Sequence, residues 1–217
     1  MASNNSEQAE GLRKTFMRTL IEDVISAQEL RHLNDTQSNR RHQIRVLFAA
    51  IEGLVWTYRE NIVSTAKSSD TLTMEEELAF SEVSYLVTPQ GKIVEQARFV
   101  PMLGMIRLTT RLAQRIDADL EVRFDNSGWD ALRQAVEIRN RITHPKSEAD
   151  LEINDTDLAT CQAGFYWLFE ICISTMMAAT TALKDYVAQF SSVVEALKRG
   201  DPDTLAAYEA AAEFLKE

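Results

Sequence analysis

A long apolar segment constrains the fold of this chain more than any other feature of its sequence. Residues 163–183, AGFYWLFEICISTMMAATTAL, are long enough to span a membrane as a helix, and no Lys or Arg occurs between Lys146 and Lys184. The segment also contains Glu170 and four Ser or Thr residues, which are unfavourable in a lipid-exposed span. We therefore expect a helix buried inside a bundle, with a membrane span as the alternative.

The composition of the whole chain is typical of an all-α protein. It contains 7 Gly and 4 Pro among 217 residues, and alternating Val, Ile and Thr runs, the usual signal of strands, are scarce. Hydrophobic residues make up 45% of the chain, which is enough for a sizeable core. Length and composition predict a helical domain at 1–199 and a C-terminal helical appendage at 200–217, separated at Gly200-Asp201-Pro202.

Apolar spacing and capping residues divide the chain into its expected elements. Helices are expected at about 7–33, 37–66, 74–85, 101–117, 128–143 and 155–199, followed by an Ala-rich helix in DTLAAYEAAAEFLKE. Thr73 and Glu76 form a capping-box pattern, and Asp155 or Thr156 is expected to cap the sixth helix. The segment YLVTPQGKIVEQARFVP predicts a short β-hairpin, with strands at 85–87 and 92–94 and a type II turn at Pro89-Gln90-Gly91 in which Gly91 stands one place later than ideal. The last helix is expected to pack on the bundle or to reach a neighbouring subunit.

The charge balance limits which partners this chain can have. A net charge of −10 and a pI near 4.9 argue against a protein that coats nucleic acid, so DNA is not an expected partner. Residues 98–146 are the one long part that is net positive, with nine Lys or Arg against six Asp or Glu. A small basic cleft in this part is compatible with the acidity of the whole.

Neither a metal nor a cofactor is expected. His32 and His42 lie in polar surroundings without the ligand spacing of a metal site, and the chain contains no phosphate-binding loop, dinucleotide fingerprint or nucleophile elbow. Cys161 and Cys172 are too far apart on one helix to bond, so both are expected to be reduced core thiols of a cytoplasmic protein. The first residues, MASNNSEQAEG, have no basic region followed by an apolar run, so no secretory signal is expected.

The segment EIRNRITHPK, residues 137–146, places an arginine on the apolar side of a helix and a histidine before a proline. On a helical wheel, Arg139 falls with Leu132 and other apolar residues. Burying a guanidinium there without a partner would be costly, so Arg139 requires an anion, a carboxylate partner or a solvated cleft. Pro145 disfavours helical dihedral angles at His144, so the helix should unwind there and free the imidazole to turn towards Arg139.

These two residues together suit metal-independent chemistry on a phosphodiester. A histidine can move protons near neutral pH, and an arginine can hold a phosphate through its fixed donors. The spacing also allows a purely structural alternative, in which Arg139 pairs with a Glu or Asp of another helix and His144 caps the end of its own helix.

The run EIRNRITHP resembles the signature of the HEPN superfamily, which is Arg, a polar residue, three further residues and then His near the end of a helix. The order of elements is also similar, because long antiparallel helices come first, a small turn segment interrupts them, and a long apolar helix follows. The resemblance covers most of residues 10–198 in pattern and about ten residues in motif. It implies an antiparallel helical bundle with a small β-hairpin or turn insertion and an extra C-terminal helix.

The resemblance also implies roles for individual residues. His144 would transfer protons, Arg139 would hold the scissile phosphate, and Asn140 would position groups beside it, while Arg141 and Lys146 are the expected substrate-binding cations. Many members of the superfamily are ribonucleases that dimerise and bring two motifs into one cleft. Attack by a ribose 2′-hydroxyl would give a cyclic phosphate and a 5′-hydroxyl. The implied partners are RNA, a second copy of the chain and an antitoxin or other protein, in a prokaryotic toxin–antitoxin or defence system.

One departure and two alternatives accompany this resemblance. Some HEPN toxins continue as His-x-Tyr, with the tyrosine modified by a nucleotidyltransferase partner, whereas this chain has His144-Pro145-Lys146, so that arrangement is not expected. Other members keep the fold without cleavage, which leaves a module that binds a protein partner or nucleotide. A structural helical scaffold is the third possibility, consistent with the acidity and the last helix.

Overall fold

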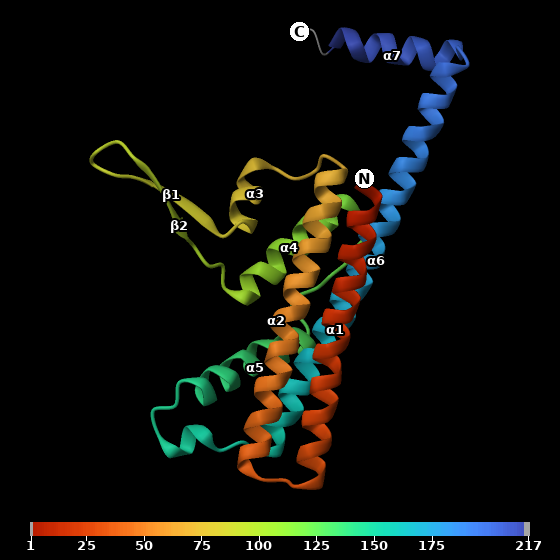
Figure 1. Cartoon of the computed structure of the whole chain (residues 1–217). Coiled ribbons are helices and arrows are strands. Elements are labelled where there is room, and N and C mark those ends of the chain that lie inside the picture. The colour runs from red at the N-terminus through yellow and green to blue at the C-terminus, as the bar shows by residue number, and fades with distance from the viewer. Residues whose placement is uncertain (1, 215–217) are drawn as a thin grey trace.

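The computed structural model has its elements in the expected order along the chain (Figure 1). It describes the backbone of residues 2–214 and the side chains of residues 15–213. The elements are α1 (Ala2–Leu33), α2 (Gln37–Ser68), α3 (Met74–Phe80), β1 (Val83–Val87), β2 (Ile93–Ala97), α4 (Met102–Ile116), α5 (Ser127–Thr143), the 3-10 helix η1 (Glu148–Leu151), α6 (Asp155–Lys198) and α7 (Pro202–Phe214). The prediction of an all-α fold with a small β-hairpin is confirmed. The division at residue 199 stays a prediction.

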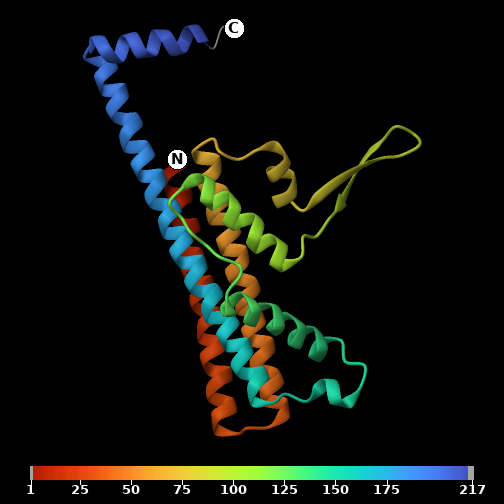
Figure 2. The ribbon, with the colours of Figure 1, turned by 180° about the vertical axis from the view of Figure 1, so that it is seen from behind.

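Helix α2 is the centre of the fold, because α1, α4, α5 and α6 all pack against it (Figures 1 and 2). Its buried side chains include Ile44, Leu47, Ile51, Leu54, Tyr58 and Ile62. The Tyr58 hydroxyl shares a hydrogen bond of 3.0 Å with the Thr110 hydroxyl of α4, so this buried polar group has a partner. The core therefore extends along α2 and reaches the last turn of α5, where Ile142 is buried, whereas the C-terminal part of α6 lies towards solvent.

Helix α3 begins at the predicted capping box of Thr73 and Glu76 but ends at Phe80, five residues earlier than expected. Its end is set by Glu82, which has a φ of 54°. The Glu82 carbonyl accepts a hydrogen bond from the Arg98 backbone N–H at 2.6 Å, and its carboxylate accepts one from the Val100 N–H at 2.9 Å. Contacts with residues much later in the chain therefore turn the backbone into β1.

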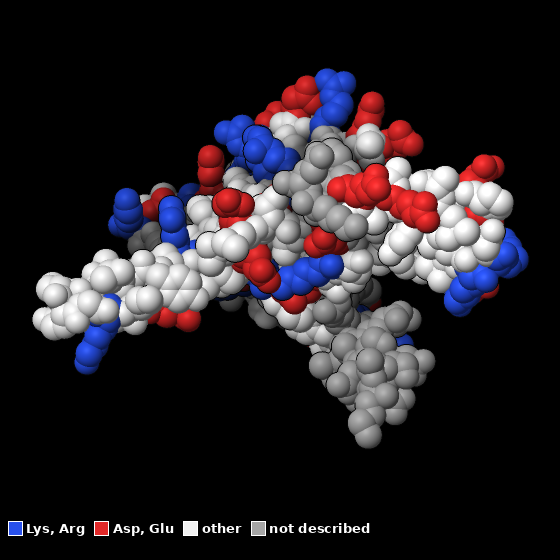
Figure 3. All heavy atoms as spheres, turned by 90° about the horizontal axis from the view of Figure 1, so that it is seen from above, with Lys and Arg blue, Asp and Glu red and all other residues white. Residues whose placement is uncertain are grey.

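The expected hairpin is present with longer strands, in which Val83 pairs with Ala97 and Val87 with Ile93. The predicted type II turn is wrong. The Thr88 carbonyl accepts from the Gly91 N–H at 2.8 Å, so the positive φ of 73° falls on the fourth residue of the turn rather than the third. The hairpin projects from the bundle and carries few charges, as its place at the left of Figure 3 shows.

Helix α6 begins one residue earlier than the predicted caps allow. Asn154 is the cap, because its side chain accepts from the Asp157 N–H at 2.8 Å while the Asp157 carboxylate accepts from the Asn154 N–H at 3.2 Å. Leu168 and Cys172 are fully buried, and Ala179 is the last buried residue of the helix. The expected burial therefore holds for one face of the first half of α6 only.

By length and composition alone, α6 is the one helix in the described part of the chain that could cross a membrane, and 22% of its apolar window is buried. The two cysteines of α6, Cys161 and Cys172, are buried and unbonded, as predicted. Burial raises the pKa of the Cys161 thiol to about 12. His32 and His42 are exposed, and no group of three or more His, Cys, Asp or Glu within the described residues could hold a metal.

Candidate functional site at the end of helix α5

The motif predicted from the sequence lies at the C-terminal end of α5. Asn126 starts this helix by accepting a hydrogen bond from the Trp129 N–H at 2.9 Å. The helix ends at Thr143, and His144 has the non-helical dihedral angles φ −124° and ψ 57°. Its backbone N–H still donates to the Asn140 carbonyl at 2.9 Å. Pro145 thus ends the helix at the predicted residue, which leaves the His144 side chain outside the regular turn.

Arg139 lies on the edge of the core, with 26% of its side chain exposed. Its Nη2 donates a hydrogen bond to Glu52 Oε1 of α2 at 3.2 Å, and the guanidinium lies 5.2 Å from the centre of the Phe48 ring. The Nε atom is buried and has no hydrogen-bond partner in the described structure. The carboxylate partner allowed by the sequence is therefore present, but it occupies only one of the five guanidinium donors.

His144 and Asn140 are both exposed at the same helix end. Among the described residues, neither side chain has a hydrogen-bond or ion-pair partner. Five residues separate His144 from Arg139, which corresponds to about 7.5 Å along a helix axis. The structure places the three predicted catalytic residues at one helix end without direct bonds between their side chains.

Of the two predicted substrate-binding cations, the Arg141 side chain has partners within the described fold and that of Lys146 does not. Arg141 donates to the carbonyls of Asp150 and Glu152 at 3.2 and 2.8 Å and to the Asp157 carboxylate at 3.0 Å. Its guanidinium therefore fastens the loop after α5 to the start of α6. Lys146 has an exposed side chain without a partner in the described structure, and it is available to bind an anion.

The start of the loop that carries Lys146 is held by the Asp150 carboxylate. Asp150 accepts hydrogen bonds from the backbone N–H groups of Lys146 at 2.8 Å and Ser147 at 2.9 Å. The Lys146 N–H is the main cause that lowers the pKa of the Asp150 carboxyl below its ordinary value. The segment after His144 is thus ordered by local hydrogen bonds to a charged group.

Sequence reasoning missed the residues of α2 that complete this site. Glu52 and Phe48 hold the Arg139 guanidinium, and Arg45 donates to the Ile142 carbonyl of α5 at 3.3 Å. Arg45, Glu52 and Arg59 are spaced seven residues apart, so they form one charged row beside the apolar face of α2. This spacing is a signal that the sequence contains, although it does not identify which helix faces the row.

A cleft of about 450 Å³ adjoins the Arg139–Glu52 pair. It is lined by Glu52, Val55, Trp56, Arg59, Glu82, Phe99, Val100, Met102 and Met105. Trp56 and Phe99 are exposed, and Phe99 has 82% of its surface free. The cleft therefore has two exposed aromatic side chains, and its charged lining residues are Glu52, Glu82 and Arg59, of which Arg59 is paired with Glu82.

The site combines one exposed histidine, one half-buried arginine and an aromatic cleft, which are groups suited to holding an anion and moving a proton. A comparison with family models gives no match for this chain, and neither do the comparisons with curated proteins and with solved structures.

Proposed function

We propose that this chain is a metal-independent endoribonuclease of the HEPN type. The observation that carries the proposal is the end of α5, where His144 has an unpaired imidazole and Arg139 has three unpaired Nη donors besides its buried Nε. A histidine exposed in this way can exchange protons with a substrate, and the arginine can accept a phosphate without breaking the core.

The reaction requires two proton transfers. The 2′-oxygen of a ribose attacks the adjacent phosphorus, the bond to the 5′-oxygen breaks, and the products are a 2′,3′-cyclic phosphate and a 5′-hydroxyl. A base removes the proton of the 2′-hydroxyl, and an acid protonates the leaving 5′-oxygen. Arg139 and Lys146 stabilise the charge that develops on the phosphate, and Asn140 donates beside it.

One chain supplies a single histidine at this site. A twofold dimer that sets two α5 ends face to face would bring two copies of His144 and two of Arg139 into one groove. One His144 would then act as the base and the other as the acid. We therefore propose a symmetric homodimer as the active species.

The cleft beside Glu52 supports RNA as the substrate. Bases of a single strand stack on aromatic side chains at about 1–3 kcal/mol per base, and Trp56 and Phe99 present such faces. Glu52 lines this cleft and pairs with Arg139, so a strand in the cleft would lie beside that ion pair. DNA lacks the attacking 2′-hydroxyl, so it would not be cleaved.

The test is cleavage of single-stranded RNA in the presence of EDTA. Wild type should cleave and give 5′-hydroxyl ends, while His144→Ala should be inactive with an unchanged circular dichroism spectrum. His42→Ala, another exposed histidine, is the matched control and should cleave like wild type. Equal cleavage by His144→Ala and wild type would refute the proposal.

The shared groove has its own test. Mixed dimers that contain one His144→Ala chain should lose most of their activity, because each reaction needs both histidines. Mixed dimers that keep half the activity or more would show that each chain works alone.

The competing function is a module that binds a protein partner or a nucleotide without cleaving RNA. The Arg139–Glu52 ion pair favours it, because a charge-compensated arginine is expected where the motif has only a structural role. Absence of RNA cleavage by both wild type and His144→Ala, with both proteins folded, would support this function. For the ribonuclease we propose a cytoplasmic toxin or defence effector, with an antitoxin or other protein partner to restrain it.

A further inference from the structure

The second half of α6 extends beyond the bundle (Figures 1 and 2), and several of its apolar side chains are exposed. We call residues 183–198 the arm. Every residue from 184 to 193 is exposed, and Phe190 at the middle has 62% of its surface free. Tyr186, Val187 and Val193 are exposed as well. Helix α7 lies beside Val193, but Tyr186, Val187 and Phe190 stay exposed, so the arm offers an apolar surface to a partner.

The apolar face follows a strict heptad pattern along α6. The residues recur at alternating spacings of three and four, and they are Tyr166, Phe169, Ile173, Met176, Thr180, Leu183, Val187, Phe190, Val194 and Leu197. Nine of these ten are apolar, and we call the set the heptad stripe. A repeat of this kind is the pattern of helices that pack side by side along their length. In the arm, Tyr186 and Val193 widen the stripe, as in a helix that lies between two neighbours rather than against one.

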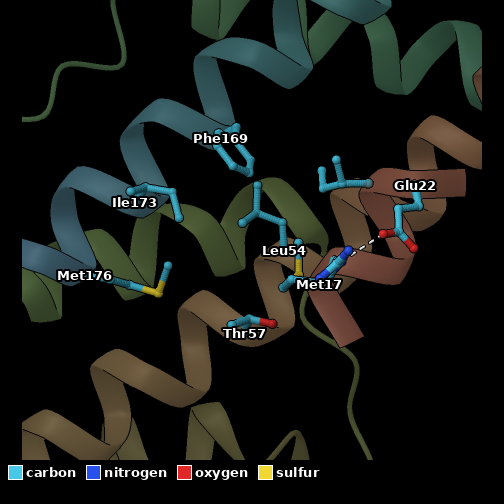
Figure 4. A pocket seen from close by; sticks show the side chains of 9 residues that line it. Met17, Glu22, Leu54, Thr57, Phe169, Ile173 and Met176 are labelled. Atoms are coloured by element: carbon cyan, nitrogen blue, oxygen red, sulfur yellow. Dashed lines mark hydrogen bonds and ion pairs between the residues drawn. The ribbon is translucent and has the colours of Figure 1, made fainter. Parts of the chain in front are cut away.

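A groove of about 410 Å³ lies beside the first half of the same stripe (Figure 4). Phe169, Ile173 and Met176 of α6 form one wall, α1 forms the other, and Leu54 of α2 lies at the base. The α1 wall contributes Met17 and Ile21, together with the Arg18–Glu22 ion pair. The groove is therefore apolar, with a charge-balanced rim, and it can take apolar side chains of a further helix.

We propose that this groove binds the arm of a second copy of the chain, in an antiparallel twofold arrangement. In the heptad stripe, Ile173 of one copy would face Phe190 of the other, and Met176 would face Val187. Groove and arm then lie on opposite sides of an axis between residues 181 and 182, each about 13 Å from it along the helix. One symmetry operation thus fills both grooves and covers both arms, as an isologous interface requires.

The charges beside the stripe also favour a second copy. Glu170 and Lys198 occupy equivalent flanking positions, so the same register would place Glu170 of each copy near Lys198 of the other. Lys184 of one copy would lie near Lys184 of the other at the axis, and this like-charge pair is unfavourable. A lipid bilayer is a poorer occupant, because the arm carries Lys184, Asp185, Glu195 and Lys198 within four turns.

This interface is separate from the groove proposed for catalysis. Leu54 and Thr57 of α2 face the groove beside α1, whereas Phe48 and Glu52 face the motif, and these pairs lie half a turn apart on α2. The arm interface therefore stands whether or not the chain cleaves RNA. Two twofold interfaces on one chain give a closed tetramer when their axes are perpendicular and intersect, whereas the arm interface alone gives a dimer.

Sedimentation at micromolar concentration tests the interface. The variant Val187→Glu with Phe190→Glu should have half the mass of wild type. The matched control, Ala188→Glu with Ser192→Glu, changes the charge equally on the opposite face of the arm and should keep the wild-type mass. A single-chain mass for wild type, or equal masses for the two variants, would overturn the proposal.

Cross-linking tests the register. Ile173→Cys and Phe190→Cys on one chain are about 25 Å apart along α6, so they can form a disulfide only between copies. Oxidation should give a covalent dimer, whereas Ile173→Cys with Ala188→Cys should not. Cross-linking of both pairs or of neither would exclude the register. Binding of wild type to phosphatidylcholine vesicles in flotation would identify a membrane as the occupant instead.

RNA cleavage distinguishes the two proposals. Val187→Glu with Phe190→Glu should keep the cleavage rate per chain of wild type, because the motif lies on the other side of α2. An inactive wild type that still shows the arm-dependent mass would refute the ribonuclease and leave the arm interface intact.

Discussion

Arg139 of α5 and Glu52 of α2, 87 positions apart in the sequence, form an ion pair of 3.2 Å at the edge of the core. The pair is partly solvated, since 58% of the Glu52 side chain is exposed. It explains how an arginine can lie on the apolar side of α5 without being an unpaired buried charge. It also leaves most of the guanidinium donors without a partner, as expected of a group that binds an anion.

Replacing Arg139 should change stability little. The pair reaches solvent through Glu52, and solvated ion pairs contribute about 0–1 kcal/mol, so Arg139→Ala should alter the free energy of unfolding by about 1 kcal/mol in urea titrations. Arg133→Ala, which removes an exposed pair with Asp130 on the same helix, is the control. A loss of 3 kcal/mol or more, typical of a broken buried pair at about 3–5 kcal/mol, would favour the structural role.

Removing the charge of Glu52 should strengthen RNA binding. In Glu52→Gln, Arg139 loses its internal anion, so a phosphate no longer competes with a carboxylate. RNA affinity should rise, and the slope of log K against log salt should steepen by about 0.7 per chain for a single strand. Glu75→Gln, at an exposed glutamate of α3, should leave both quantities unchanged. Weaker binding by Glu52→Gln would show that Glu52 serves to orient Arg139 for the substrate.

The loop after His144 should lose protection in acid. The pKa of Asp150 is lowered in the folded chain, so its stabilising effect is present above the ordinary carboxyl pKa and is lost as pH falls through the lowered value. Hydrogen-exchange protection of the Lys146 and Ser147 amides should therefore decrease as the pH is lowered. Asp150→Asn should remove this pH dependence, and Glu148→Gln should not.

The close packing of α5 on α6 should depend on Gly164. A Cβ atom at this position would lie 2.7 Å from the Leu132 Cα, which is backbone and cannot move aside. Gly164→Ala should therefore destabilise the fold by about 1–3 kcal/mol. Gly104→Ala is the control, because its Cβ would meet only the Val100 side chain at 3.5 Å. In α4 that change should be neutral or stabilising by up to about 1 kcal/mol in thermal or urea unfolding.

Local chemistry accounts for the parts of the structure that the sequence predicts well. Thr73 with Glu76 starts α3, and Pro145 ends α5, because each effect acts within four residues. The end of α3 at Phe80 could not be predicted in this way, since the Arg98 and Val100 amides bind Glu82 from across the hairpin. Long-range contacts of this kind have no periodic signal.

In the candidate site, too, local effects could be predicted and contacts between distant residues could not. The position of His144 outside the helix follows from its neighbour Pro145, but the partner of Arg139 lies on another helix and could not be named. Arg141 was expected to bind substrate, yet its donors reach the Asp150 and Glu152 carbonyls and the Asp157 carboxylate, which only the folded loop brings together. Such contacts depend on how helices cross.

The uninterrupted length of α6 makes the direction of α7 depend on residue count. Each residue of an α-helix adds 1.5 Å and about 100° of rotation, so deleting one residue from the arm would swing α7 to another side of the molecule. Deleting seven would shorten the arm by about 10 Å and rotate α7 by only about 20°. Natural changes in the length of this helix should therefore come in whole heptads, whereas the hairpin tip can gain or lose single residues freely.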